Sequence, residues 1–155
     1  MQLFLDSADI DEINLINQLG IIDGITTNPT LIAKTGYDFK STIIEICKII
    51  HADISVEVAA NDFDGMIIQG NKIAEISSNI VIKLPVTWDG IKACKYFIAK
   101  NIRVNMTLCF SSNQALIAAK AGATYVSPFI GRLDDIGQDG MSLISDIKQI
   151  YENYQ

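Results

Sequence analysis

Short apolar runs alternate along the chain with longer stretches in which apolar residues recur at helical spacing. The first run, Leu3 to Asp6, predicts a short strand. The spacing of the isoleucines and leucines from Ile10 to Leu19 predicts a helix, which Gly20 ends. This strand and this helix form the first βα unit.

The same order recurs five more times before the last residues of the chain. Further strands are predicted at Ile21 to Thr27, Ile54 to Ala59, Ile80 to Val86, Ile102 to Leu108 and Thr124 to Pro128. One helix is predicted to end near His51, and the next to begin after an N-cap at Asp62. Three more are predicted from Asp89 to Lys100, from Ser111 to Gly122 and from Gly140 to Tyr154. Six βα units indicate a parallel sheet with helical crossovers, either doubly wound or closed as a barrel, and the periodicity does not choose between the two.

Composition narrows the class of protein. The 155 residues are 49% hydrophobic and contain no linker or low-complexity tract, which predicts a single domain over residues 1–155. The net charge is −6 and the lysines are scattered, so we expect no nucleic-acid surface. No run approaches about 18 apolar residues and no signal peptide is recognisable, so we expect a cytoplasmic protein with no membrane contact.

The cysteines give no indication of a metal site. Cys47, Cys94 and Cys109 are odd in number and far apart in the sequence. Metal sites use short paired spacings that this chain lacks. We therefore expect three reduced thiols and no metal ligands.

Lys83 is the most informative residue, because it lies inside an apolar, β-branched run that is typical of a strand buried on both faces. Removal from water disfavours the ammonium form of a lysine and makes its neutral amine available as a nucleophile. Such an amine forms a Schiff base with a carbonyl, as in aldolase-type chemistry. The alternative is structural: a long side chain that reaches solvent at the strand end, or a buried amine paired with a carboxylate.

Other polar residues also fall late in the predicted strands. They are Asp6, Thr26 to Asn28, Glu57, Asn105 with Thr107, and Ser127. In a barrel the carboxyl ends of the strands converge on one site, whereas in an open sheet most of these groups would lie too far apart, so the pattern favours the barrel. Each residue also has an ordinary explanation: Asp6 or Asn28 as a helix cap, Glu57 as the partner of a surface lysine, and Asn105 as a partner of backbone groups.

Six segments resemble the small transaldolase family over essentially the whole chain. They are Phe4-Leu5-Asp6-Ser7-Ala8-Asp9, Thr26-Thr27-Asn28-Pro29-Thr30, Val56-Glu57-Val58, Val81-Ile82-Lys83-Leu84-Pro85, Asn105-Met106-Thr107-Leu108 and the run from Tyr125 to Asp135. The resemblance implies a parallel (β/α) TIM barrel. It also implies a Schiff-base transferase that moves a dihydroxyacetone unit between sugar phosphates in the pentose phosphate pathway, with no metal or organic cofactor.

The resemblance also implies roles for individual residues. Lys83 would be the Schiff-base lysine, Asp6 the proton donor and acceptor for sugar hydroxyls, and Glu57 with Thr107 the pair that holds a catalytic water. Two carboxylates beside one amine suit this chemistry, because C3–C4 cleavage and carbinolamine dehydration each need a proton carrier. The expected substrate-binding residues are Thr26, Asn28, Asn105, Ser127, Phe129 and Arg132.

The nearest rival of the same fold is a fructose 6-phosphate aldolase, a lyase. That group typically has Gln in place of Glu57 and Tyr in place of Phe129, and this chain has the transaldolase choice at both positions. A tyrosine hydroxyl could assist protonation and release of the bound enamine. The sequence therefore favours transfer over release.

The number of βα units departs from the family pattern. A complete barrel has eight strands, and we recognise about six βα units, so we expect a barrel that is incomplete at its C-terminal end. Exposed edges of the first and last strands would favour pairing with another chain, and we expect a homo-oligomer. The alternative function is a catalytically silent barrel that serves as an interaction module.

Overall fold

The computed structural model describes residues 1–154, which form two compact units. Unit 1 consists of Met1–Ala60 and Asp64–Lys83. Unit 2 consists of Asn61–Phe63 and of the residues from Leu84 onward. The prediction of a single domain over the whole chain stays a prediction.

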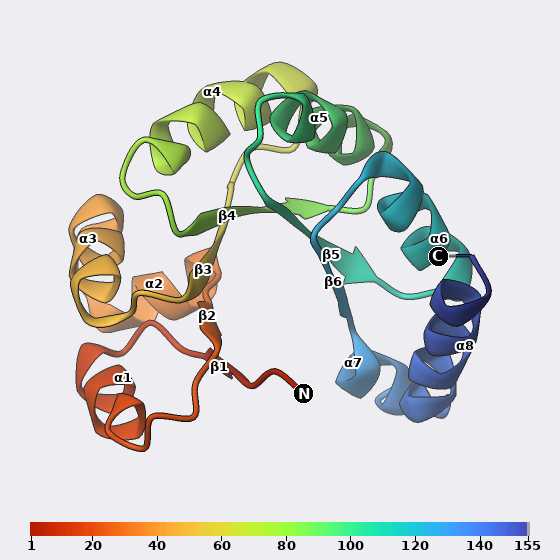
Figure 1. Ribbon diagram of the computed structural model, residues 1–155, viewed down its shortest axis with the longest axis horizontal. Coiled ribbons are helices and arrows are strands. Elements are labelled where there is room, and N and C mark those ends of the chain that lie inside the picture. Colours follow the sequence, from red (N-terminus) through yellow and green to blue (C-terminus); the bar gives the residue numbers. More distant parts are fainter. Residues whose placement is uncertain (155) are drawn as a thin grey trace. The chain divides into compact units, whose positions relative to one another are not determined.

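In unit 1 three strands are each followed by helix, and the unit ends within a fourth strand, at Lys83. Its elements are β1 (Phe4–Asp6), α1 (Ile10–Asn17), β2 (Gly24–Thr26), α2 (Pro29–Thr35), α3 (Phe39–Ile49), β3 (Asp53–Glu57), α4 (Phe63–Ala74) and β4 (Ile80–Pro85). The strands are adjacent in chain order, and β1 with β2, β2 with β3 and β3 with β4 pair in parallel. Figure 1 shows α1, α3 and α4 on one side of these strands.

Strand register divides the side chains of unit 1 between two faces of the sheet. Asp6 pairs with Thr26, Thr26 with Ser55, and Glu57 with Lys83. Because register partners and residues two apart point to the same face, these five residues share one face. The opposite face carries apolar side chains, namely Leu5, Ile25, Ile54, Val56 and Ile82. Burial of these apolar side chains fixes the strands, and with them the positions of the polar residues on the other face.

Side-chain caps explain where the first helices of unit 1 begin. Asp9, Asn28 and Asp38 each accept hydrogen bonds from backbone N–H groups in the first turn of α1, α2 and α3. These contacts satisfy donors that have no partner inside a helix. Gly36 takes the left-handed conformation (φ 73°) that ends α2.

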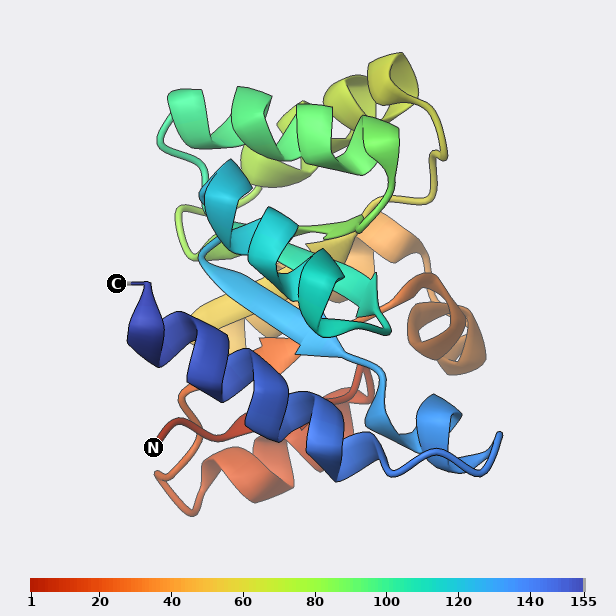
Figure 2. The ribbon, with the colours of Figure 1, turned by 90° about the vertical axis from the view of Figure 1, so that its right-hand side faces the viewer.

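Unit 2 continues the same alternation. After the last residues of β4 come α5 (Trp88–Ala99), β5 (Val104–Cys109), α6 (Ser112–Ala121), β6 (Tyr125–Pro128), α7 (Ile130–Asp134) and α8 (Gly140–Asn153). The strand order runs from the end of β4 to β5 and β6, and β5 and β6 are parallel. Figure 2 shows α6 and α8 side by side, with β6 next to them.

A small apolar core fixes α6, α7 and α8 in unit 2. Its buried residues are Cys109, Ala115, Leu133, Leu143 and Ile147. Tyr151 of α8 packs against this cluster, and its hydroxyl donates a hydrogen bond of 2.9 Å to the carbonyl of Ala115. Burial raises the pKa of Tyr151, so this hydroxyl keeps its proton to a higher pH than the hydroxyl of an exposed tyrosine.

The predicted fold class, an incomplete parallel (β/α) barrel, is confirmed by this order of strands and helices. The six predicted strands are present, and Ser111 and Gly122 bound α6 as expected. Two helices were not predicted: α2, which Asn28 starts, and α7, which carries Arg132. Within residues 1–154, no helix is long and apolar enough to cross a membrane.

Candidate active site

Lys83 is buried in β4, as its apolar surroundings predict. The residue is 6% exposed, and all six residues of the strand are buried. Its amine nitrogen (Nζ) lies 3.3 Å from the Glu57 carboxylate oxygen Oε2 and donates a hydrogen bond of 3.2 Å to the carbonyl of Thr27. The amine therefore has two oxygen partners away from bulk water.

Glu57 occupies the last position of β3, directly beside Lys83 in the sheet register. Its side chain is 19% exposed, so one carboxylate can meet both the buried amine and a solvent-borne molecule. The interpretation of Glu57 as the partner of a surface lysine is wrong, because its partner is the buried Lys83. The pair is the amine–carboxylate contact that a structural role of Lys83 also predicts, so its presence alone does not assign catalysis.

Asp6 and Thr26 form a second contact on the same face of the sheet. The Thr26 hydroxyl donates a hydrogen bond of 2.7 Å to Oδ1 of Asp6. Asp6 is exposed and does not cap α1, because Asp9 takes that position. The interpretation of Asp6 as a helix cap is therefore wrong, and its second carboxylate oxygen has the solvent access that a proton carrier needs.

Asn28 caps α2 and is also the neighbour in sequence of Thr27, which contacts Lys83. Its amide oxygen accepts a hydrogen bond of 2.9 Å from the backbone N–H of Leu31, which confirms the capping interpretation. An asparagine oriented through its oxygen presents its NH₂ group as a donor. Asn28 directly follows Thr27, whose carbonyl binds Lys83.

In unit 2, Asn105 and Ser127 lie together. Asn105 is 3% exposed, and its amide oxygen accepts a hydrogen bond of 2.9 Å from the Ser127 hydroxyl. Asn105 pairs in register with Tyr125, two residues before Ser127, so Asn105 and Ser127 point to the same face of the sheet. This contact fixes the orientation of a buried amide.

Thr107 is fully buried, and among residues 1–154 its hydroxyl has no hydrogen-bond partner. The backbone carbonyl of Thr107 accepts a bond of 2.8 Å from the N–H of Val86, so the strand itself is paired at this point. The next residue, Leu108, has a positive φ of 56°, and the register of β5 and β6 shifts between Met106 and Cys109. A bulge of this kind changes the direction of side chains at a strand end.

Phe129 and Arg132 follow β6. The ring of Phe129 packs edge-on against Phe110, with centroids 5.3 Å apart. Arg132 lies on the short helix α7, where its guanidinium is 3.4 Å from the carboxylate of Asp135 and its side chain is 73% exposed. The predicted phosphate-binding arginine is thus accessible, and a carboxylate lies beside it.

Side-chain contacts join the predicted site residues in three pairs: Lys83 with Glu57, Thr26 with Asp6, and Ser127 with Asn105. Lys83, Glu57, Asp6, Thr26 and Asn28 belong to unit 1, and Asn105, Thr107, Ser127, Phe129 and Arg132 belong to unit 2. Their union in one site stays a prediction. The sequence did not predict the contact between Lys83 and the Thr27 carbonyl, because every residue has a backbone carbonyl. It also did not predict the bulge at Leu108, because a leucine rarely adopts a positive φ.

The cysteines and possible metal ligands are the other side chains that could support chemistry. Among residues 1–154, no group of three or more His, Cys, Asp or Glu side chains is placed to hold a metal ion. Cys47, Cys94 and Cys109 are free, and burial raises the pKa of each thiol. A raised pKa disfavours the reactive thiolate. The arrangement around Lys83 is the candidate for chemistry.

Comparison of the sequence with protein families gives a match over residues 3–155 to a model described as "Transaldolase/Fructose-6-phosphate aldolase". A protein of Jannaschia sp. named "Probable transaldolase" is 54% identical over 154 residues, which cover 99% of this chain and 71% of that protein. A protein of the same name from Brucella ovis is 56% identical, with the same shares covered. The similarity therefore extends over essentially all of this chain.

Solved structures that resemble the chain share its fold. Orotidine 5'-monophosphate decarboxylase from Metallosphaera sedula superposes with a TM-score of 0.55 at 11% identity, over 81% of this chain and 64% of that one. Thiamine phosphate pyrophosphorylase from Pyrococcus furiosus gives 0.55 at 17% identity, over 82% and 59%. At such low identity the likeness shows the fold alone.

Proposed function

Because the chain belongs to the transaldolase/fructose-6-phosphate aldolase family, we propose that it is a Schiff-base transaldolase. The reaction transfers a dihydroxyacetone unit from sedoheptulose 7-phosphate to glyceraldehyde 3-phosphate, giving erythrose 4-phosphate and fructose 6-phosphate, as in the pentose phosphate pathway. The observation that carries this proposal is the buried Lys83 amine, 3.3 Å from the Glu57 carboxylate.

Each chemical step has a residue of the right kind. The Lys83 amine attacks the ketone carbon of the donor sugar, and the resulting carbinolamine loses water to give an iminium ion. Asp6 takes the proton of the C4 hydroxyl and the C3–C4 bond breaks, so that erythrose 4-phosphate leaves as the aldehyde and the electrons of the bond move into the iminium to give an enamine. The enamine then attacks the acceptor aldehyde, and water hydrolyses the new Schiff base to release the product.

Glu57 and Thr107 manage water in this proposal. Glu57 lies close enough to the Lys83 amine to exchange a proton with it, and dehydration of a carbinolamine needs such a carrier. The buried Thr107 hydroxyl has no partner among residues 1–154 and is able to hold the water that leaves and later returns. The two residues come from different units, so their cooperation is part of the proposal.

The remaining residues bind the sugar. Asn28 and Asn105 orient the dihydroxyacetone hydroxyls. The hydroxyl of Thr26 holds the carboxylate of Asp6 in place, and the hydroxyl of Ser127 holds the amide of Asn105. Phe129 borders the sugar chain, and Arg132 binds the phosphate, a group that suits the planar fork of a guanidinium. Phosphate binding then replaces the exposed contact between Arg132 and Asp135.

Borohydride reduction tests the proposal. Protein and fructose 6-phosphate are mixed, reduced and digested, and mass spectrometry locates the adduct. We expect a stable adduct on Lys83 that is absent from Lys83→Ala and present in Lys95→Ala, which removes an exposed lysine of α5. A folded protein that gives no adduct would instead support the silent interaction module.

Transfer is distinguished from release by the products. With fructose 6-phosphate and an acceptor aldose phosphate, we expect the transferred ketose as the main product. Free dihydroxyacetone as the main product would favour the aldolase alternative. Glu57 and Phe129 support transfer, because they match the transaldolase choice at both positions.

The setting of the reaction also belongs to the proposal. The three free cysteines agree with a reducing compartment such as the cytoplasm. We expect copies of the chain to associate as a homo-oligomer, with no nucleic-acid or membrane partner. Light scattering on the purified protein measures the mass of the assembly, and a monomer across the micromolar range would contradict the expectation.

A further inference from the structure

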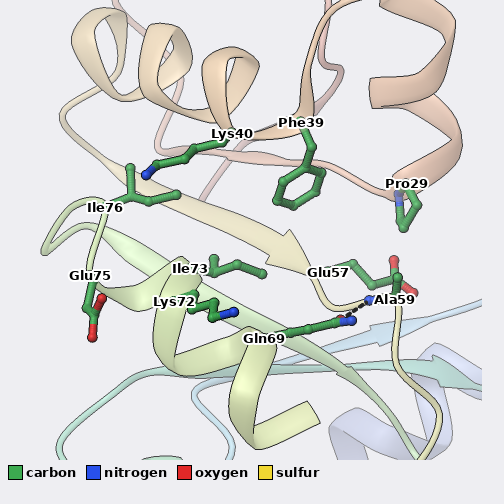
Figure 3. A pocket seen from close by; sticks show the side chains of 10 residues that line it. All are labelled: Pro29, Phe39, Lys40, Glu57, Ala59, Gln69, Lys72, Ile73, Glu75 and Ile76. Carbon is green, nitrogen blue, oxygen red and sulfur yellow. Dashed lines mark hydrogen bonds between the residues drawn. The ribbon is translucent and has the colours of Figure 1, made fainter. Parts of the chain in front are cut away.

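A groove in unit 1 lies between α3 and α4, beside the candidate active site, and Glu57 is among the residues that line it. Its volume is about 450 Å³, which is within the range of small-molecule sites. Phe39 and Lys40 line it from the start of α3, and Gln69, Lys72 and Ile73 line it from α4 (Figure 3). All the residues that line it belong to unit 1.

The groove combines an apolar floor with cations on both walls. Phe39, Ile73 and Ile76 supply apolar surface, and Figure 3 shows the Phe39 ring projecting into the space between the helices. Lys40 extends from α3 and Lys72 from α4. Within residues 1–154, neither lysine takes part in an ion pair, whereas Lys48 on the same helix as Lys40 is paired with Glu45. Lys40 attracts the solvent-exposed carboxylate of Asp38 without forming an ion pair with it, so an anion in the groove competes with Asp38 for this ammonium group.

The carboxylates at the groove do not cancel this charge. Glu57 is committed to Lys83, at 3.3 Å. Glu75 is exposed, and Figure 3 shows its carboxylate directed away from Phe39 and the two lysines. The lining of the groove thus combines apolar side chains with one ammonium group from each of the two helices.

Gln69 connects the groove with the candidate active site. Its side-chain oxygen accepts hydrogen bonds from the backbone N–H groups of Ala59 and Ala60, at 2.9 and 3.0 Å (Figure 3). These residues lie two and three positions after Glu57, in the loop after β3. An occupant of the groove would therefore contact the side chain that fixes this loop.

We propose that the groove between α3 and α4 is a binding site for a small amphipathic anion, with an apolar or aromatic body and one carboxylate, sulfonate or phosphate group. The body packs on Phe39, Ile73 and Ile76, and the anionic group binds between Lys40 and Lys72. Neither the apolar floor nor the cations suffice alone, because exposed ion pairs are weak and an uncharged apolar molecule leaves both lysines without a partner. The Schiff-base reaction proposed above does not require an occupant in this groove, although Glu57 borders both sites.

The probe is 8-anilinonaphthalene-1-sulfonate, an aromatic monoanion whose fluorescence rises in apolar surroundings. We expect saturable binding with one probe per chain. In Lys40→Gln/Lys72→Gln we expect the dissociation constant to rise about fivefold or more, since exposed ion pairs contribute up to roughly 1 kcal/mol each. The matched control, Lys34→Gln/Lys48→Gln, removes the same charge from exposed lysines of α2 and α3 that do not line the groove.

Three outcomes would overturn the proposal: no saturable binding to the folded protein, equal weakening in both double variants, or equal affinity for the uncharged analogue N-phenyl-1-naphthylamine. The second would mean that overall charge governs binding, and the third that the lysines play no part. Phe39→Ala tests the apolar floor and should weaken both probes. Circular dichroism melting of each variant separates lost binding from lost folding. None of these measurements uses a sugar phosphate, so failure here is distinct from failure of the proposed reaction.

Discussion

Four candidate site residues of unit 1 form side-chain contacts in pairs, whereas the side-chain hydroxyl of a central residue of unit 2 has no hydrogen-bond partner among residues 1–154. Lys83 contacts the Glu57 carboxylate and the Thr27 carbonyl, and Thr26 donates to Asp6. The hydroxyl of Thr107 is fully buried and has no partner among residues 1–154. Unit 1 thus holds groups able to exchange protons with each other, and unit 2 holds a donor that folding has not used.

The partnered amine of Lys83 and the unpartnered hydroxyl of Thr107 affect the stability of the fold differently. A buried amine is destabilising unless a partner compensates it, so the contacts of Lys83 are what allow a lysine in an apolar strand. A buried hydroxyl without a partner costs about 1–3 kcal/mol, and valine would fill the same space without that cost. The water proposed above to bind Thr107 would offset this cost.

The largest expected effect comes from breaking the pair in unit 1. Lys83→Met keeps an unbranched buried side chain but removes the nucleophile, and we expect activity to fall by about 10⁴-fold or more. Lys95→Met on the exposed surface of α5 is the control. A coupled assay for erythrose 4-phosphate measures both variants. Activity of Lys83→Met within tenfold of the unchanged protein would mean that the pair is structural.

Asp6→Asn separates Schiff-base formation from bond cleavage. The amide still accepts a hydrogen bond from the Thr26 hydroxyl but cannot take the proton of the C4 hydroxyl. We expect turnover to fall about 10²- to 10⁴-fold while borohydride still traps fructose 6-phosphate on Lys83. Loss of the trapped adduct as well would assign Asp6 to an earlier step or to folding.

Thr107→Val tests the unused donor of unit 2. We expect activity to fall by roughly 10²-fold with stability unchanged or slightly increased, since no protein hydrogen bond is lost. Thr107→Ser, which keeps a hydroxyl, should recover most of the activity. Urea denaturation gives the stability, and a clear loss of stability in the valine variant would show that Thr107 has a protein partner.

Thr27→Val is the matched change in unit 1, where the buried hydroxyl is satisfied. The Thr27 side chain donates a hydrogen bond of 3.0 Å to the carbonyl of Ser55. We expect the free energy of unfolding to fall by about 1 kcal/mol, with activity changed less than in Thr107→Val. Equal stability effects in the two valine variants would remove the distinction between the units.

The sequence predicted these residues better than it predicted their contacts. The apolar, β-branched residues around Lys83 predict that it is buried, because a strand that is covered on both faces has no solvent-exposed position. The partner of Lys83 follows only from the register that sets Glu57 beside it. The helix α2 was missed because Pro29 and Gly36 suggest a loop, and Asn28 turns the same segment into a capped helix. The bulge at Leu108 depends on long-range pairing with β6 and has no local cause.

The smallest expected effect concerns a buried thiol of unit 2 outside the candidate site. Burial raises the pKa of Cys94 from 9.0 to about 11, so between these pH values the unfolded chain loses a proton that the folded chain keeps. Stability is therefore fully present below pH 9 and decreases as the pH rises towards 11. Cys94→Ala should lose part of this decrease in urea denaturation between pH 8 and 10.5, whereas Cys47→Ala, at a half-buried position, should change it less. An identical pH dependence in Cys94→Ala and the unchanged protein would show that Cys94 ionises as readily in the folded state as in the unfolded one.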